Sequence, residues 1–296
     1  MAKEGTAMKI KNYRVEGREK FQLADHATDK TSGKNKGVKT EAELARNIAK
    51  LVQLQDVLYA HNKFGVLVIL QAMDAAGKDG VIKHIMSGLN PQGVEVTPFK
   101  VPSAEELDHD YLWRSHEHLP ERGTIAIFNR SYYEDVLVVK VHNLVEKQNL
   151  PIEVLDKDIW KERYRQLRDF EQYMHENGIL VVKIFLHLSK NEQAQRLLER
   201  IDNPDKNWKF SAGDLHERQY WQQYQDAYEE MIRETATEHA PWYIVPADRK
   251  WFSRLLISDI LVQTLEKLPL AYPELGEEEK GKLAEYRQQL AKELGL

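Results

Sequence analysis

The stretch VLVILQAMDAAGKDGVIKHI, residues 66–85, decides the fold because it carries an apolar strand into a turn of small residues and then into a helix. A phosphate-binding P-loop has this order, since its turn and the helix N-terminus point backbone N–H groups at phosphate oxygens. The Walker A pattern G-x-x-x-x-G-K-[ST] would need Gly at Ala72 and Ser or Thr at Asp79. The stretch therefore predicts a phosphate cradle of unusual composition, with a chance turn as the alternative.

Small residues in this turn let the backbone approach an anion, and the dipole of the following helix favours negative charge there. Lys78 adds a point charge that can reach between phosphates. Asp79 serves either as an acid at the helix N-terminus or as a metal ligand. The residues expected to contact phosphate are Ala75, Ala76, Gly77, Lys78, Asp79 and Gly80.

An acid inside the cradle, Asp74, predicts a metal ion. A carboxylate beside phosphates is repelled unless a cation lies between them, and Mg²⁺ is usually held by one or two carboxylates plus phosphate oxygens. We therefore expect Mg²⁺, with Mn²⁺ as a substitute, at Asp74. The alternative is that Asp74 caps the loop by accepting hydrogen bonds from backbone N–H groups.

A second apolar strand ends in the polar segment FNRSYYEDV, residues 128–136. In P-loop proteins the strand beside the cradle often ends in an acid that orders Mg²⁺, but Asn129 stands there in this chain. Arg130 follows, and at the carboxyl end of a parallel strand it is placed to clamp a phosphoryl group. A salt bridge from Arg130 to Glu134 or Asp135 is the alternative.

A third cluster, residues 196–220, combines helical and loop patterns with several cations. Arg196 and Arg200 lie one helical turn apart on one face, and Lys206 and Lys209 follow in a loop. Cations in a loop between two helices predict a lid that closes over phosphates and excludes water. A charged helix hairpin at the surface would have the same composition.

Strands that are apolar on both faces alternate with helical patterns along the chain, which predicts an α/β fold with a central parallel sheet and helices on both faces. Residues 136–142 fit either a strand or a helix. The predicted strands are Gly65–Ala72, Val94–Phe99, Thr124–Phe128, Leu180–Leu188 and Trp242–Val245. The predicted helices are Gly80–Ser87, Ala104–His116, Leu155–His175, Asn191–Ile201, Asp214–Thr235 and Arg249–Leu265.

Both ends of the chain are polar. Residues 1–40 lack periodicity and predict a solvated, mobile arm, although Lys30, Lys34, Lys36 and Lys39 also suit a basic flap on an anionic substrate. Thr40 and Glu43 have the spacing of a capping box, which predicts a helix from Thr40 onward. The last residues predict an exposed amphipathic helix.

Composition excludes several classes of protein. The 296 residues carry a net charge of -5, which disfavours a nucleic-acid binder, and no cysteine, which excludes disulfides and thiolate metal sites. No apolar run approaches the roughly 20 residues of a membrane helix, and the N-terminus lacks the apolar core of a signal peptide. His84 is expected to be a packed or surface residue. We expect a cytoplasmic enzyme or binding protein.

The segments MDAAGKDG, FNRSYYEDV, RIDNPDKNWKFSAGDL and APWYIVPADRKWFSR together resemble the polyphosphate kinase 2 family, within the thymidylate-kinase-like P-loop kinases. The resemblance spans about Phe21–Leu268. It implies a three-layer P-loop kinase fold with a helical lid, and a helical form for residues 131–142. In this family the loop carries an acid at the Asp74 position and needs neither the first Gly nor the final Ser or Thr.

The resemblance also implies the reaction, a Mg²⁺-dependent phosphoryl transfer between inorganic polyphosphate and ADP or AMP that forms ATP or ADP. The implied catalytic residues are Asp74, Lys78 and Arg130, with Asp74 as the metal ligand. Many family members carry Asp where this chain has Asn129, so the residue that completes the metal site stays open. The implied substrate-binding residues outside the cradle are Asn129, Tyr133, Glu134, Arg200, Lys206 and Lys209.

Other features of the family are expectations for this chain. The sequence YYED, which includes Glu134, resembles that of the subgroup that phosphorylates both nucleoside mono- and diphosphates. A homo-oligomer, either a dimer or a tetramer, is expected. The resemblance divides the chain into a basic arm (1–40), a P-loop phosphotransferase domain (41–268, with the lid at about 196–220) and a C-terminal helix (269–296).

Two rival functions stay open. An ATP-dependent nucleoside monophosphate kinase shares the cradle and the lid, but it should carry a base-reading pocket and does not account for the surplus of cations. A non-catalytic nucleotide-binding module needs neither Asp74 nor Arg130. The direction of the reaction, the nucleobase and the polyphosphate chain length are not decided by the sequence.

Overall fold

The strand that leads into the cradle, β2 (Gly65–Ala72), lies inside a six-stranded sheet of order β1-β6-β5-β2-β4-β3. The computed structural model describes residues 8–17, 20–155 and 158–296. All neighbouring strands run parallel except β1, which pairs antiparallel with β6. The other strands are β1 (Arg14–Val15), β3 (Val94–Pro98), β4 (Ile125–Asn129), β5 (Ile179–His187) and β6 (Trp242–Pro246).

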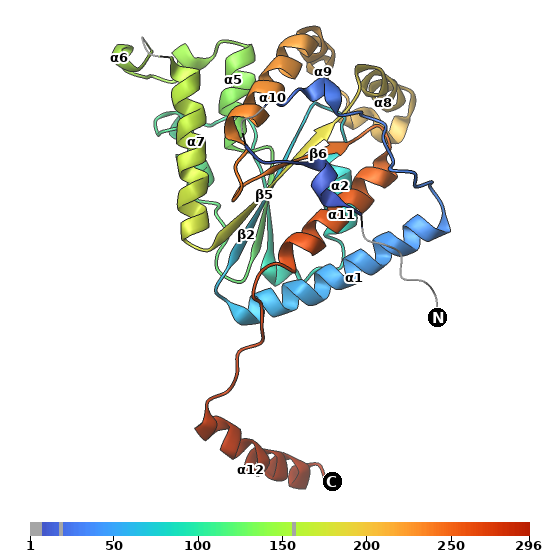
Figure 1. Ribbon diagram of the computed structural model, residues 1–296, viewed down its shortest axis with the longest axis vertical. Coiled ribbons are helices and arrows are strands. Elements are labelled where there is room, and N and C mark those ends of the chain that lie inside the picture. Colours follow the sequence, from blue (N-terminus) through green and yellow to red (C-terminus); the bar gives the residue numbers. More distant parts are fainter. Residues whose placement is uncertain (1–7, 18–19, 156–157) are drawn as a thin grey trace.

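Helices cover both faces of this sheet, which confirms the predicted three-layer α/β fold (Figure 1). Side chains of β2 alternate between two cores: Val66 and Val68 pack toward α1 (Val38–His61) and α11 (Lys250–Leu265), whereas Leu67 packs into the opposite core. The opposite core includes α7 (Ile159–Glu176) and α10 (Trp221–Thr235). Burial of both faces explains why the central strands β2, β4, β5 and β6 are mostly apolar, whereas the edge strand β3 is largely exposed.

The N-terminal segment differs from the predicted solvated arm. In its described part, Ile10 and Tyr13 are buried in one core and Phe21 in the other. Strand β1 adds an edge to the sheet, and the Thr28 hydroxyl donates to Asp248 at 2.8 Å. Scattered apolar residues without periodicity give no sequence signal for this packing. Residues 1–7 and 18–19 of the predicted arm lie outside the described residues.

The start of α1 corrects the predicted capping box. The helix begins at Val38 with Gly37 as its N-cap, and the Thr40 hydroxyl accepts a hydrogen bond from the Gly37 N–H at 3.1 Å. Thr40 therefore occupies the third helical position. Glu43 instead binds Lys34 at 2.6 Å, which links the N-terminal segment to the helix.

The other predicted helices are found with shifted or divided bounds. The predicted helix Ala104–His116 consists of two short helices, because Ser103 caps the first and the Asp110 side chain accepts from the Leu112 N–H in a turn before the second. Within residues 131–142, the 3-10 turn η4 and the short helix α5 give the helical form that the family resemblance implied. Within the predicted helix Leu155–His175, residues 156–157 lie outside the described part.

The remaining helices of the fold are α2 (Lys78–Ile85), α3 (Ala104–Leu107), α4 (Trp113–His116), α5 (Val138–Val141), α6 (Ile152–Leu155), α8 (Lys190–Asp202) and α9 (Ala212–Glu217). The 3-10 turns are η1 (Ile10–Tyr13), η2 (Leu23–Asp25), η3 (Pro91–Gly93), η4 (Tyr132–Val136), η5 (Val145–Lys147), η6 (Pro204–Lys209) and η7 (Arg218–Tyr220).

The predicted C-terminal helix, α12 (Glu277–Glu293), extends away from the rest of the protein, and its residues are exposed except the partly buried Ala291 (Figure 1). The proposed division of the chain at residues 40 and 268 stays a prediction. Across the described ranges, no helix is both long enough and apolar enough to traverse a lipid bilayer.

Candidate active site

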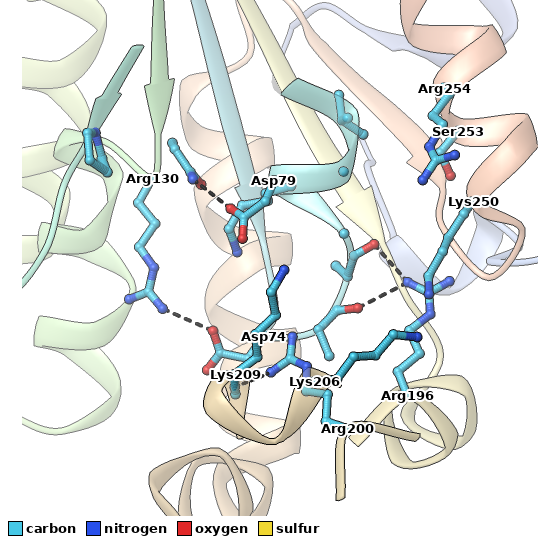
Figure 2. Close-up of a pocket in the computed structure, with 18 of the residues that line it drawn as sticks. Asp74, Asp79, Arg130, Arg196, Arg200, Lys206, Lys209, Lys250, Ser253 and Arg254 are labelled. Carbon is cyan, nitrogen blue, oxygen red and sulfur yellow. Dashed lines mark hydrogen bonds and ion pairs between the residues drawn. The ribbon is translucent and has the colours of Figure 1, made fainter. Parts of the chain in front are cut away.

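A cavity of about 590 Å³ lies over the cradle, at the ends of β2 and β4 and the N-terminus of α2 (Figure 2). In parallel α/β sheets, ligands bind at this carboxyl edge of the strands. The cavity is lined by all the predicted cradle residues, by Asn129 and Arg130 from β4 and the turn after it, and by the predicted lid cations. The sheet thus brings the three predicted clusters to one place.

The turn of the cradle has backbone conformations that suit close approach to an anion. Gly77 is the N-cap of α2 and has a φ of 107°, in the left-handed region that favours glycine, and Ala75 also has a positive φ of 62°. The Lys78 ammonium donates to the Ala72 carbonyl at 2.9 Å. Burial lowers the pKa of Lys78, and Arg130 lowers it further, while Asp74 and Glu134 oppose the shift. A bound phosphate would favour the charged form of this lysine.

Arg130 joins the turn after β4 to the cradle. Its guanidinium lies 3.0 Å from Asp74 Oδ1 (Figure 2). The same guanidinium lies 3.9 Å from Glu134 Oε2. Burial acts to lower the pKa of Arg130, but Glu134 and Asp74 outweigh it and raise that pKa. Of the two alternative salt bridges, the one to Glu134 is present and the one to Asp135 is not, since Asp135 pairs with Arg163. The Arg130 side chain still lines the cavity with 41% of its surface exposed, and its role in phosphate binding stays a prediction.

Asn129 also contacts the cradle. Its side-chain amide donates to Asp79 Oδ1 at 3.0 Å. An amide can donate to a carboxylate, whereas an aspartate at this position would repel it. This bond gives Asn129 a defined role at the cavity in place of the acid that the family resemblance led us to expect.

Arg196 binds the backbone of the cradle and is not an exposed lid cation. Only 5% of this residue is exposed, and its guanidinium donates to the carbonyls of Ala75 and Ala76 at 3.1 and 2.8 Å, and to Ala247 at 2.6 Å. These bonds fasten the turn to α8 and to the end of β6. The helical spacing of Arg196 and Arg200 predicted a shared face but not that one of them would be buried against the cradle.

The other lid cations lie at the cavity with partners of their own. Arg200 binds Asp214 at 3.1 Å, Lys206 binds Glu199, and the Lys209 ammonium lies 4.9 Å from the centre of the Trp208 ring. Trp208 itself is 78% exposed. The segment is helical and cation-rich, as predicted, and its closure as a lid stays a prediction.

Sequence reasoning did not assign Lys250 and Arg254, which line the cavity from α11 (Figure 2). A Cβ built on Gly80 would lie 3.4 Å from Arg254 Nη2, so this guanidinium sits over the first turn of α2. Both residues fall in the fourth segment that carried the family resemblance, residues 240–254. The presence of this segment in the family resemblance is the sequence signal that could have identified Lys250 and Arg254 as site residues.

The cavity is strongly cationic. Among the described residues, nine Lys and Arg side chains line it against three acids, an excess of six positive charges in a protein of net charge -5. The cations are Lys78, Lys100, Arg130, Arg196, Arg200, Lys206, Lys209, Lys250 and Arg254, and the acids are Asp74, Asp79 and Glu199. Charges of one sign in a cleft focus the potential and attract a ligand of the opposite sign.

Some predicted residues lie elsewhere. Tyr133 is fully buried, and its hydroxyl donates to Glu171 at 2.6 Å, so the prediction that it binds substrate is wrong. Glu134 does not line the cavity, and it contacts Arg130 from outside it. Asp135 pairs with Arg163 at 3.7 Å. None of the four lysines of the predicted basic flap is among the cavity-lining residues.

The donor set tests the fit of a metal ion. Among the described residues, no group of three or more His, Cys, Asp or Glu side chains is arranged to hold a metal by itself. Asp74 lines the cavity, and one of its oxygens binds Arg130, which leaves the other oxygen available. One carboxylate beside a phosphate cradle suits Mg²⁺, which keeps water and phosphate oxygens as its remaining ligands.

Comparisons with known proteins agree with this geometry. The family model for polyphosphate kinase 2 matches residues 34–271. An ADP-polyphosphate phosphotransferase of Rhodopseudomonas palustris is 51% identical over 288 residues, 96% of this chain and 99% of that protein. An AMP/ADP-polyphosphate phosphotransferase of Meiothermus ruber is 49% identical over 269 residues, 90% of this chain and 96% of that protein. The crystal structure of polyphosphate kinase 2 from Arthrobacter aurescens TC1 superposes with a TM-score of 0.88 at 38% identity, covering 99% of this chain and 100% of that one.

Proposed function

The chain belongs to the polyphosphate kinase 2 family and is a phosphotransferase, and from that premise we propose that it transfers a phosphoryl group between inorganic polyphosphate and ADP or AMP. The cation excess of the cavity is the observation that carries this proposal. A nucleotide alone brings few charges, whereas a polyphosphate chain carries about one per phosphate. Nine cations around one cradle are suited to the longer polyanion.

The cradle and Arg130 are proposed to perform the chemistry. Phosphoryl transfer requires mainly positioning of the reactants and stabilisation of charge on the transferring group. Lys78 and the N-terminus of α2 would hold that group from the cradle, and Arg130 would approach it from β4. The hydrogen bond from the Arg130 guanidinium to Asp74 keeps both side chains at the cavity.

We propose Mg²⁺, with Mn²⁺ as a substitute, as the metal and Asp74 as its protein ligand. When bound, Mg²⁺ neutralises charge on the phosphate oxygens. Asp79 is held by Asn129 at the same cavity and is the candidate for a second, water-mediated contact. The amide of Asn129 would then orient this carboxylate rather than bind the metal itself.

Both nucleoside mono- and diphosphates are proposed as acceptors. Support comes from the relative in Meiothermus ruber, which is named for AMP and ADP. We further propose a homo-oligomer as the assembled form, as the family resemblance implies, and the cytoplasm as its location, as expected from the composition.

The test compares phosphoryl donors for AMP. Purified protein with Mg²⁺ and AMP receives either polyphosphate or ATP, and ADP formation is measured. We expect ADP with polyphosphate as the donor, and loss of that activity with EDTA. A protein that phosphorylates AMP only from ATP would be a nucleoside monophosphate kinase, and one that binds nucleotide without turnover would be a binding module.

A further inference from the structure

A buried ion pair outside the cavity joins β5 to α7. The Lys183 ammonium donates to Glu171 Oε2 at 2.6 Å, and neither side chain has any exposed surface. Such a pair is weak evidence for stability, because the cost of removing two charges from water offsets their attraction, and apolar replacements are often tolerated. Its position within an otherwise apolar core therefore calls for another explanation.

The remaining hydrogen bonds of this pair lead to the turn that follows Arg130. The hydroxyls of Tyr132 and Tyr133 both donate to Glu171 Oε1, at 3.0 and 2.6 Å. Lys183 also donates to the Tyr133 hydroxyl at 3.0 Å and to the Thr235 carbonyl at 2.8 Å. All three donors of the ammonium and both oxygens of the carboxylate are used, and a buried polar network with every group satisfied is rigid.

The turn itself needs such support. Arg130 has a φ of 65°, a left-handed conformation that non-glycine residues rarely adopt and that persists where the surroundings hold it. Its own N–H donates to the Leu70 carbonyl at 3.1 Å, and the next residue, Ser131, binds the Gln71 amide at 3.0 Å. These bonds hold the turn on the side of β2, and the two tyrosines hold it on the side of β5 and α7.

We propose that Glu171 and Lys183 are positioning residues for Arg130, acting through Tyr132 and Tyr133. The network fixes the backbone directly after Arg130. The Arg130 side chain therefore points from the turn toward Asp74 and the cradle. Neither charged residue reaches the cavity. This inference rests on the proposed role of Arg130 in phosphoryl transfer.

Removal of the two tyrosine hydroxyls tests the proposal without deleting the ion pair. In Tyr132→Phe/Tyr133→Phe we expect kcat to fall about 10-fold or more, because small misplacement of a catalytic group has large effects on rate, with KM for ADP and polyphosphate little changed. Tyr164→Phe is the matched control: Tyr164 is 2% exposed in the same core, and its hydroxyl accepts from Lys140 at 3.3 Å, not from the Glu171–Lys183 pair. Thermal unfolding establishes that each variant is folded at the assay temperature.

A double-mutant cycle with Arg130→Ala separates positioning from general damage. If the tyrosines act through Arg130, their removal in the Arg130→Ala background should change kcat by less than about twofold. An equal loss in both backgrounds, or a wild-type kcat for the phenylalanine variant, overturns the proposal. Should the double variant not fold, Tyr132→Phe alone enters the same cycle. If Arg130→Ala itself is fully active, the proposed role of Arg130 fails instead.

Discussion

Neutralising the two lid lysines should weaken polyphosphate binding far more than nucleotide binding. Lys206 and Lys209 line the cavity on η6, and the Lys206 side chain is 42% exposed, so water screens its charge. Two unit charges 4 Å apart interact by about 1 kcal/mol at the dielectric constant of water. Loss of both lysines therefore removes about 2 kcal/mol of attraction for a polyanion that contacts both, which corresponds to a roughly 30-fold rise in KM.

The assay measures ATP formation from ADP at varied polyphosphate and salt concentrations. In Lys206→Ala/Lys209→Ala we expect the KM for polyphosphate to rise about 30-fold and its logarithmic salt dependence to decrease by about 1.5, since each released counterion contributes about 0.7–0.9. The KM for ADP should change less than about threefold, because ADP brings fewer charges. Lys280→Ala/Lys282→Ala on α12 is the matched control: it removes the same charge from an exposed helix outside the cavity. If only the KM for ADP rises, the lid lysines bind the nucleotide, and their proposed contact with polyphosphate is refuted.

Three further predictions concern single side chains. Lys78→Ala should lower kcat by about 100-fold or more while the protein stays folded, and near wild-type turnover would remove the cradle from the mechanism. Asp74→Asn should raise the Mg²⁺ concentration needed for half-maximal activity, and an unchanged metal titration, or full wild-type activity in EDTA, would contradict the metal site. Burial raises the pKa of Asp259 to about 6, so this carboxyl favours the folded state while it is protonated and loses that contribution as the pH rises through about 6. Asp259→Asn should therefore raise the free energy of unfolding by about 1–3 kcal/mol at pH 8 and change it little at pH 4, and equal effects at both pH values would contradict this.

Much of the fold was predictable because its central strands are buried on both faces. A run such as residues 65–72 has no polar face, so its strand and its central place follow from composition. Strand β1 was missed because two residues carry no pattern, and it forms only because β6 offers an edge. The break between α3 and α4 depends on caps inside an otherwise helical pattern, which periodicity does not detect.

The site was predicted where a motif carries its own chemistry, as in the cradle and Arg130. Tyr133 was misplaced because a motif does not say which neighbouring side chains turn into the core. The spacing of Arg196 and Arg200 predicts a common face, but whether that face meets solvent or the cradle depends on how α8 packs. Lys250 and Arg254 reach the cavity only because β6 places α11 beside α2.

We propose polyphosphate as the phosphoryl donor to ADP. Phosphorus NMR of purified protein with ADP, Mg²⁺ and polyphosphate tests it directly, since every phosphate is followed in one spectrum. We expect ATP to form while an equal amount of polyphosphate phosphate disappears. Formation of ATP and AMP in equal amounts, with polyphosphate unchanged, would mean transfer between two nucleotides and would contradict the claim.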